Sequence, residues 1–123
     1  GLLLDEADRR IGPVLHGPIA AAALPEKLDI RDQDLLNAVR YHSTLRAGAS
    51  VLEKIVFVAD KIAYDPNSSH RGEYVPALRA APSLDEAALV YLAFLRVNVS
   101  QYGGIMHPNA AAAYKELAGR VAR

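Results

Sequence analysis

Helix-start signals stand before the apolar segments of this chain, and they constrain its fold more than any other feature. Ser50 and Ser83 are each followed three residues later by glutamate, the reciprocal pattern of a capping box. Asp32 is a third cap, and prolines suited to a first helical turn follow Gly17 and His107. No segment shows clean period-two alternation bounded by turn residues. The sequence therefore predicts an all-α protein.

These signals predict at least five helices, beginning near residues 18, 33, 51, 84 and 108. We expect helices from 18 to about Pro25, from 33 to about His42, from 51 to Ile62 or Ala63, and from 108 onwards, and a long helix from 84 to about Tyr102. Between the helices that begin at 51 and 84, we expect a loop over 64–75 and a short helix over 76–81. Residues 5–10 are too short a segment to assign. The β-branched run 51–58 also suits a buried strand, but its capping box and its length favour a helix.

Length and charge exclude several classes of protein. The 123 residues make one domain, and 14 basic residues balance 14 acidic ones, so the basic excess of a general nucleic-acid binder is absent. Without cysteine there is no disulfide scaffold, zinc finger, iron–sulfur cluster or thiol catalysis. The longest apolar run, Ala87 to Leu95, is nine residues, about half of a membrane span. The first residues lack the basic n-region of a signal peptide, so we expect a cytoplasmic protein without a membrane partner.

The chain is apolar for its size. Half of it is hydrophobic (51%), and its mean hydropathy of +0.05 is high for a short soluble chain. Small domains bury a modest fraction of their surface, so we expect exposed apolar area that suits a partner subunit, as in a homodimer, or a missing piece of the same fold. The start at Gly1 rather than methionine predicts a fragment or a processed product.

Histidines and carboxylates in unusual places are the candidate site residues. Asp60 ends an apolar helical run, where a carboxylate must be paired or bind a metal; an ion pair with Lys61 or with an arginine is the simpler alternative. His16 and His42 fall on helices before it. Considered singly, His42 is more simply a hydrogen-bonded core residue than a ligand, and His16 is more simply a helix N-terminal residue. If the three helices pack as a bundle, the side chains converge into a site that suits Mn, Fe or Zn.

The remaining polar candidates have simpler alternatives. Arg46 and Lys54 flank the segment between His42 and Asp60 and are candidates to face an anionic substrate, with surface charge as the alternative. His107 is interpreted as a helix cap and His70 as a solvated loop residue. The chain has no GxGxxG, Walker, GxSxG or HExxH motif.

Three groups of residues resemble a known family. They are Val14-Leu15-His16-Gly17-Pro18, the block Tyr41-His42-Ser43-Thr44 with Arg46 to Ser50, Leu52 to Ile55 and Ala59-Asp60, and Ile105-Met106-His107-Pro108. Together they resemble the YqeK family of HD-domain phosphohydrolases, which hydrolyse diadenosine tetraphosphate symmetrically to two ADP. The resemblance extends from Gly1 to about Leu117 and is strongest over 39–60.

The resemblance implies an HD-type helical bundle with a two-metal site. It implies that Asp60 is the final aspartate of the first metal position, and that His16 and His42 bind a second metal near the substrate phosphates. It also implies Asp60 and His42 as catalytic residues, and iron or another divalent transition metal that activates a bridging water. With a phosphate substrate, we expect Arg46 and Lys54, the candidates chosen from their positions, to contact its phosphates.

The chain departs from the family at its start. The family's first histidine and its His-Asp dyad are not in this chain, so residues 1–123 correspond to the C-terminal two-thirds of the family domain. Ala63 stands where the family often has an acidic residue, and the loop 64–75 differs. The alternatives to a metal-dependent hydrolase are a catalytically incomplete nucleotide-binding module and a helical interaction or dimerisation module.

Overall fold

The computed structural model describes residues 16–63, 71–99 and 105–122, which form six helices and no strand. The helices are α2 (His16–Leu28), α3 (Gln33–Arg40), α4 (Val51–Ala63), α5 (Arg71–Ala80), α6 (Leu84–Val97) and α7 (Pro108–Val121). The predicted all-α class and the predicted helix starts near 18, 33, 51, 84 and 108 are confirmed.

The caps that predicted these starts make the expected hydrogen bonds. The Ser50 hydroxyl accepts the amide of Glu53 at 3.2 Å, and the Ser50 amide donates to the Glu53 carboxylate at 2.9 Å, so the capping box is reciprocal. The Ser83 hydroxyl accepts a hydrogen bond from the Glu86 amide at 3.1 Å, and the Asp32 carboxylate accepts one from the Leu35 amide at 2.9 Å. His107 accepts the amide two residues on at 3.0 Å, with proline at the first helical position of α7. These short-range bonds explain why the starts could be predicted.

The first helix is longer than predicted. Instead of stopping near Pro25, α2 continues to Leu28 with the proline inside it. A proline removes one hydrogen bond and strains the preceding turn, but it does not by itself end a helix. The end comes at Asp29, whose φ of +53° is left-handed, a conformation that aspartate tolerates better than most residues.

Three other predicted boundaries were wrong. The helix α3 ends at Arg40, two residues before His42, and α6 ends at Val97, where Asn98 donates to the Phe94 carbonyl. The helix α5 begins at Arg71, so the expected loop 64–75 is wrong over 71–75. Burial of Tyr74 and Val75 against α6 explains that earlier start. The predictions for 5–10, 64–70 and 100–104 fall outside the described residues.

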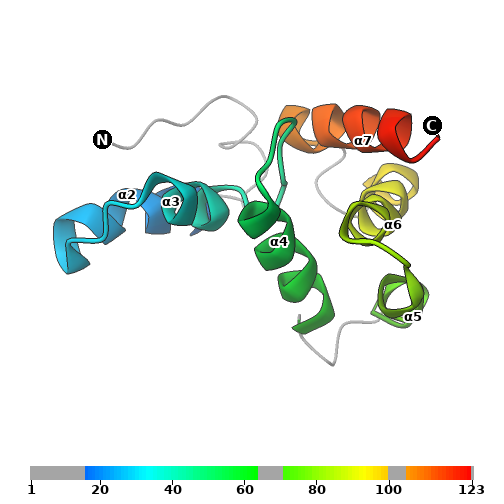
Figure 1. Cartoon of the computed structure of the whole chain (residues 1–123), viewed down its shortest axis with the longest axis horizontal. Coiled ribbons are helices and arrows are strands. Elements are labelled where there is room, and N and C mark those ends of the chain that lie inside the picture. Colours follow the sequence, from blue (N-terminus) through cyan, green and yellow to red (C-terminus); the bar gives the residue numbers. More distant parts are fainter. Residues whose placement is uncertain (1–15, 64–70, 100–104, 123) are drawn as a thin grey trace.

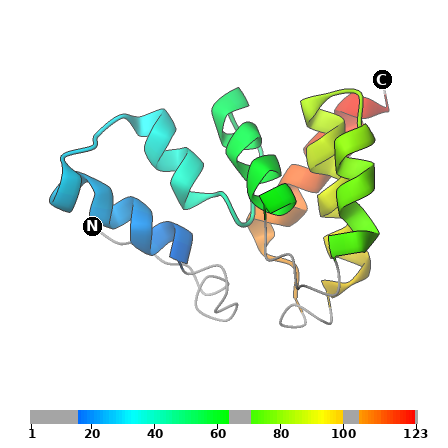
Figure 2. The same cartoon turned by 90° about the horizontal axis from the view of Figure 1, so that it is seen from below.

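The helices form an arm and a body joined by α4 (Figures 1 and 2). The helices α2 and α3 lie side by side as the arm, and α3 also packs on α4. The body is built by α4, α5, α6 and α7, with α6 contacting each of the other three. One core cluster centres on Phe57, Leu92 and Leu117, and a second joins Tyr74 and Leu78 to α6. The helix α4 therefore carries side chains toward both the arm and the core.

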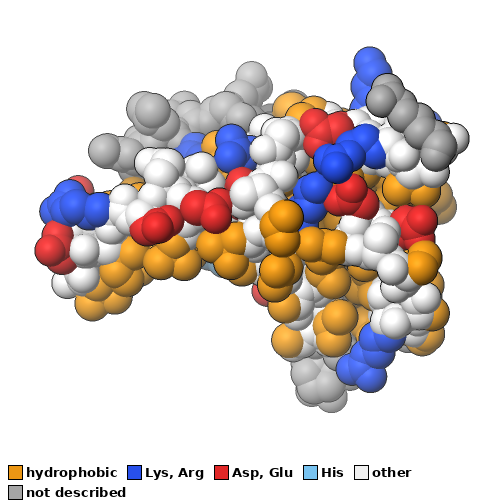
Figure 3. Space-filling model, viewed as in Figure 1, with side chains coloured by type: hydrophobic (Ala, Val, Ile, Leu, Met, Phe, Trp, Pro, Cys, Tyr) orange, Lys and Arg blue, Asp and Glu red, His pale blue; other side chains and the backbone are white. Residues whose placement is uncertain are grey.

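Apolar side chains are exposed along this arrangement, as the mean hydropathy predicted. Figure 3 shows them along the lower edge of the arm and over α4. The exposed large apolar side chains of the described residues are Ile19, Leu28, Leu35, Val51, Ile55, Val97 and Val121. Across the same residues, no helix combines the length and apolarity that crossing a membrane requires.

Candidate functional site

Two histidines far apart in the sequence meet where the arm joins α4. His16 begins α2 and His42 lies in the turn after α3, and their Nε2 atoms are 2.7 Å apart. The rings meet edge to face with centroids 4.5 Å apart. Gly17 permits this approach, because a Cβ atom there would lie 2.6 Å from the Arg40 carbonyl oxygen. Close packing of α2 on α3 therefore creates the pair.

The surroundings of His42 determine which nitrogen is available. Its Nδ1 lies 2.6 Å from the carbonyl oxygen of Val39, so Nδ1 carries the proton and donates it. In the neutral ring, Nε2 then offers a lone pair toward His16, whose Nε2 also lies 3.3 Å from the Ser43 hydroxyl. A ring that donates its other N–H to a backbone carbonyl has the arrangement typical of metal-ligating histidines.

Asp60 is joined to this pair through a lysine. Its carboxylate accepts from the Lys61 ammonium at 3.1 Å, which is the ion pair that the sequence offered as the simpler alternative. The same ammonium donates to the backbone carbonyls of His42 and Ser43, both at 3.3 Å. Asp60 keeps about a third of its side chain exposed. One ammonium group thus connects the Asp60 carboxylate to the backbone of the turn that carries His42.

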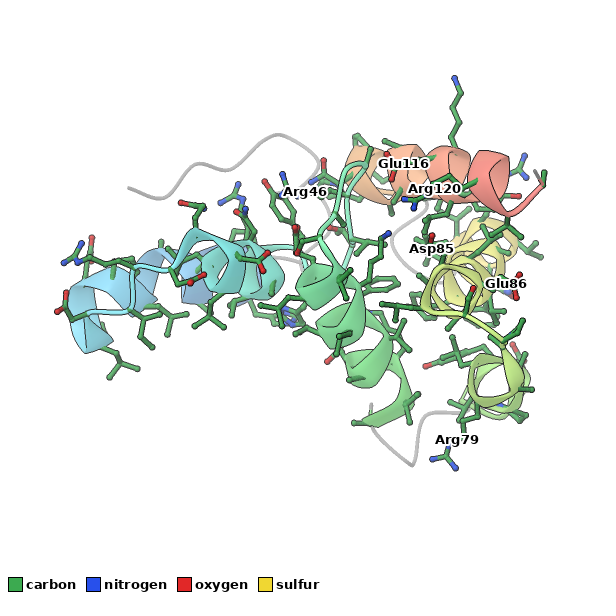
Figure 4. All side chains as sticks on the ribbon, in the orientation of Figure 1. Arg46, Arg79, Asp85, Glu86, Glu116 and Arg120 are labelled. Carbon is green, nitrogen blue, oxygen red and sulfur yellow. The ribbon has the colours of Figure 1, made fainter. Side chains whose placement is uncertain are left out.

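The two cations predicted to contact phosphate are held in ion pairs. Arg46 lies in the segment between α3 and α4 and donates to both carboxylate oxygens of Glu53, at 2.7 and 3.0 Å (Figure 4). Lys54 is buried and pairs at 2.7 Å with Asp85, which also contacts Arg120 at 3.4 Å. Lys54 is therefore not the surface charge of the alternative interpretation, and the structure brings neither cation to the histidine pair.

The other two histidines have different outcomes. His107 is the buried cap of α7, as predicted. His70 lies outside the described residues.

The Arg46–Glu53 pair predicts a pH-dependent stability. Burial alone would raise the pKa of Glu53, but the hydrogen bonds from Arg46 and Ser50 outweigh it and hold this pKa below its ordinary value of 4.5. The ionised glutamate therefore stabilises the fold above about pH 4.5, and the contribution is lost as the pH falls through the lowered pKa. We expect Glu53→Gln to lower the free energy of unfolding by about 2 kcal/mol at pH 7 and by much less in acid.

Urea unfolding of Glu53→Gln and of the unsubstituted chain at both pH values measures this difference. Glu26→Gln, at an exposed position of α2, is the matched control and should change stability little at either pH. An equal loss in Glu53→Gln at both pH values would contradict the assignment.

The donor set fits a metal ion in part. Imidazole nitrogens and a carboxylate suit a divalent transition metal, and the His42 hydrogen bond to Val39 favours ligation through Nε2. Within residues 16–63, 71–99 and 105–122, however, no three histidine, aspartate or glutamate side chains gather closely enough to hold an ion. The described residues thus bring together two imidazole nitrogens, which are fewer donors than a closed metal site contains.

Comparisons with known proteins support the resemblance seen in the sequence. No family model matches the chain. A symmetrical bis(5'-nucleosyl)-tetraphosphatase of Halalkalibacterium halodurans is 33% identical over 104 residues, covering 85% of this chain and 54% of that protein. The protein of the same name from Bacillus subtilis is 37% identical over 71 residues, covering 58% of this chain and 31% of the relative. The chain spans about half the length of the first of these relatives and less of the second.

A solved structure shows the same fold. It is described as a predicted HD superfamily hydrolase involved in NAD metabolism, from Clostridium acetobutylicum, and it is 34% identical with a TM-score of 0.82. The match covers 98% of this chain and 62% of that one, so the expected HD-type helical fold is confirmed. The chain is therefore a homologue of the symmetrical bis(5'-nucleosyl)-tetraphosphatases and has the helical fold of the HD superfamily.

Proposed function

We propose that this chain forms part of the metal and phosphate site of a dinucleoside polyphosphate hydrolase, which converts diadenosine tetraphosphate to two ADP. The observation that carries the proposal is the 2.7 Å contact between the Nε2 atoms of His16 and His42. With Nδ1 of His42 protonated, its Nε2 accepts a hydrogen bond from the Nε2–H of His16; when that proton is removed, two lone pairs face one place that a cation can occupy. The tetraphosphatase relatives support a nucleotide as the substrate.

His16, His42 and Asp60 have separate roles in this proposal. The two imidazoles would bind a divalent transition metal such as Mn or Fe at the second position, beside the substrate phosphates, and Asp60 would contribute a carboxylate at the first position. A bound metal supplies a polarised phosphoryl oxygen and a water of lowered pKa. The chain's own residues orient these donors: the Val39 carbonyl fixes the His42 ring through Nδ1.

The two cationic side chains predicted to contact phosphate already have acidic partners. Arg46 and Lys54 face Glu53 and Asp85, which neutralise their charges. Bound metal ions would therefore neutralise most of the negative charge of the substrate phosphates. Assembly as a homodimer is proposed on the exposed apolar side chains of the arm and α4.

The test compares the 123-residue chain with the same chain fused to the part of the Halalkalibacterium halodurans relative that the match leaves out. ADP release from diadenosine tetraphosphate is measured with added Mn²⁺ or Fe²⁺. We expect little turnover by the chain alone and substantial turnover by the fusion, because the described residues supply too few ligands for paired ions.

Substitutions in the active fusion identify the residues responsible. Asp60→Ala should abolish both metal retention and turnover, and His42→Ala should reduce turnover at least about 10-fold while the fold remains intact. Asp29→Asn is the control: Asp29 is exposed, lies far along the arm, and has a backbone that asparagine also tolerates. Full activity of the chain alone would show that the ligand assignment is wrong. Tight nucleotide binding without metal or turnover in both proteins would favour the nucleotide-binding module instead.

A further inference from the structure

A buried ammonium group lies beside the candidate site. Lys61 is only 6% exposed, although it is charged and stands near the end of α4. Its Nζ atom lies over the rings of Phe57 and Tyr91, 4.8 and 4.9 Å from their centroids. Burial removes water from this ammonium group, which disfavours its charge. A charge kept in such a place needs specific partners.

The partners of Lys61 match the donors of an ammonium group one for one. An ammonium has three N–H donors, and Nζ contacts three oxygens: the Asp60 carboxylate and the carbonyls of His42 and Ser43. Two of the three belong to the turn that carries His42. The lysine therefore fastens that turn to α4, 18 to 19 residues further along the chain.

The turn itself has backbone features that need support. Leu45 follows it with a φ of +59°, a left-handed conformation that is unusual for a branched residue, and its side chain is buried in the core. The Leu45 amide closes the turn on the Tyr41 carbonyl at 2.7 Å. The turn is thus held from two sides, by Leu45 in the core and by Lys61 on its carbonyls.

We infer that Lys61 is a positioning residue, which holds the His42 turn so that Nδ1 meets the Val39 carbonyl and Nε2 faces His16. It also ties the backbone of His42 to the carboxylate of Asp60, so the imidazole pair and the carboxylate are held as one unit. The inference deepens the proposed function, because it rests on that function for the role of His42 as a ligand. The positioning itself is a statement about geometry and can be tested separately.

The chain offers a matched control for Lys61. Lys54 lies two turns earlier on the same helix, has the same 7% side-chain exposure, and also makes an ion pair, with Asp85. Its ammonium donates to the Asp85 carboxylate on α6 and not to the histidine turn. Lys61→Met and Lys54→Met each replace a buried ammonium by an apolar side chain of similar length. They differ in whether the His42 turn loses its donor.

The experiment measures long-range ¹H–¹⁵N spectra of the histidine rings in the 123-residue chain. The unsubstituted chain should show His42 as a fixed Nδ1–H tautomer, and titration with Mn²⁺ should broaden its ring signals. We expect Lys61→Met to lose the fixed tautomer and to require roughly 10-fold more Mn²⁺ for the same broadening. Lys54→Met should keep the tautomer and the Mn²⁺ response, even where it lowers the unfolding midpoint as much.

The outcomes separate the inference from the proposed function. A fixed tautomer in folded Lys61→Met would overturn the inference and leave the proposed function standing. Absence of a Mn²⁺ effect in the unsubstituted chain would count against the metal role, while loss of the tautomer in Lys61→Met alone would still support the positioning role. If Lys61→Met does not fold, couplings across the hydrogen bonds from Lys61 Nζ to the carbonyl carbons of His42 and Ser43 decide: their presence supports the inference, and their absence overturns it.

Discussion

Replacement of Gly17 by alanine is expected to separate the two imidazoles of the candidate site. A Cβ atom at this position would lie 2.6 Å from the Arg40 carbonyl oxygen and 3.1 Å from that of Val39. Both obstacles are backbone atoms, which cannot rotate away as a side chain can, so α2 must move off α3. His16 is adjacent to Gly17 and moves with it. We expect a loss of about 1–3 kcal/mol in the free energy of unfolding and at least about a 10-fold loss of Mn²⁺ affinity.

Gly119→Ala is the control for this substitution. Gly119 also lies within a helix, but a Cβ atom there meets nothing within 4 Å. Alanine should therefore stabilise α7 by about 0.5–1 kcal/mol and leave the histidine signals unchanged. Urea unfolding and the histidine ring spectra measure both variants. A Gly17→Ala protein that keeps the Nε2–Nε2 contact, seen in its crystal structure or its ring spectra, would show that the approach of α2 to α3 is not limited by this position.

Helix starts could be predicted because the groups that make them are neighbours in the sequence. Ser50 and Glu53 exchange two hydrogen bonds within one turn, and Ser83 repeats half of that pattern. Helix boundaries without such a local cap depend more on tertiary packing. Nothing local indicates that α5 begins before Pro76, since the cause is burial of Tyr74 against α6, a helix further along the chain.

The candidate site was predicted in part for the same reason. The sequence identified His16 and His42, and the structure brings them together, but the contact depends on a glycine whose importance appears only when α2 meets α3. Lys61 entered the sequence interpretation only as a partner for Asp60. Its contacts with the His42 turn require the fold to return α4 to the end of α3.

For Lys54, the sequence interpretation and the structure give different partners. Its position between His42 and Asp60 suggested a cation facing a substrate, whereas the structure gives it Asp85 as a partner, 31 residues away. The sequence did contain a signal that Lys54 is buried, namely its helical spacing from Phe57 and Lys61. Lys54 lies three residues before Phe57 and seven before Lys61, so all three share the face of α4 that turns toward the body. Lysines on a core-facing stripe are candidates for buried ion pairs rather than for substrate contacts.

Replacement of Phe57 by alanine is expected to cause the largest loss of stability. Phe57 is fully buried in the core cluster, and its ring meets Tyr91 edge to face with centroids 5.6 Å apart. Removing a buried phenyl group loses its transfer free energy and leaves a cavity, a loss of about 3–5 kcal/mol. Since small domains are stable by about 5–15 kcal/mol in total, the variant should be marginally folded at 37 °C.

The same substitution should reach the candidate site, because the Phe57 ring is one of the two aromatic faces against the Lys61 ammonium. In the fraction that remains folded, we expect the His42 ring signals to shift, since the group that holds its turn has lost a packing partner. Ile55→Ala is the control: it removes an apolar side chain of the same helix that is 48% exposed, and should change stability by at most about 0.5 kcal/mol. Thermal unfolding followed by circular dichroism measures both. A loss of under about 1 kcal/mol for Phe57→Ala would mean that α4 does not pack against α6 through this ring, and the support for Lys61 would have to come from elsewhere.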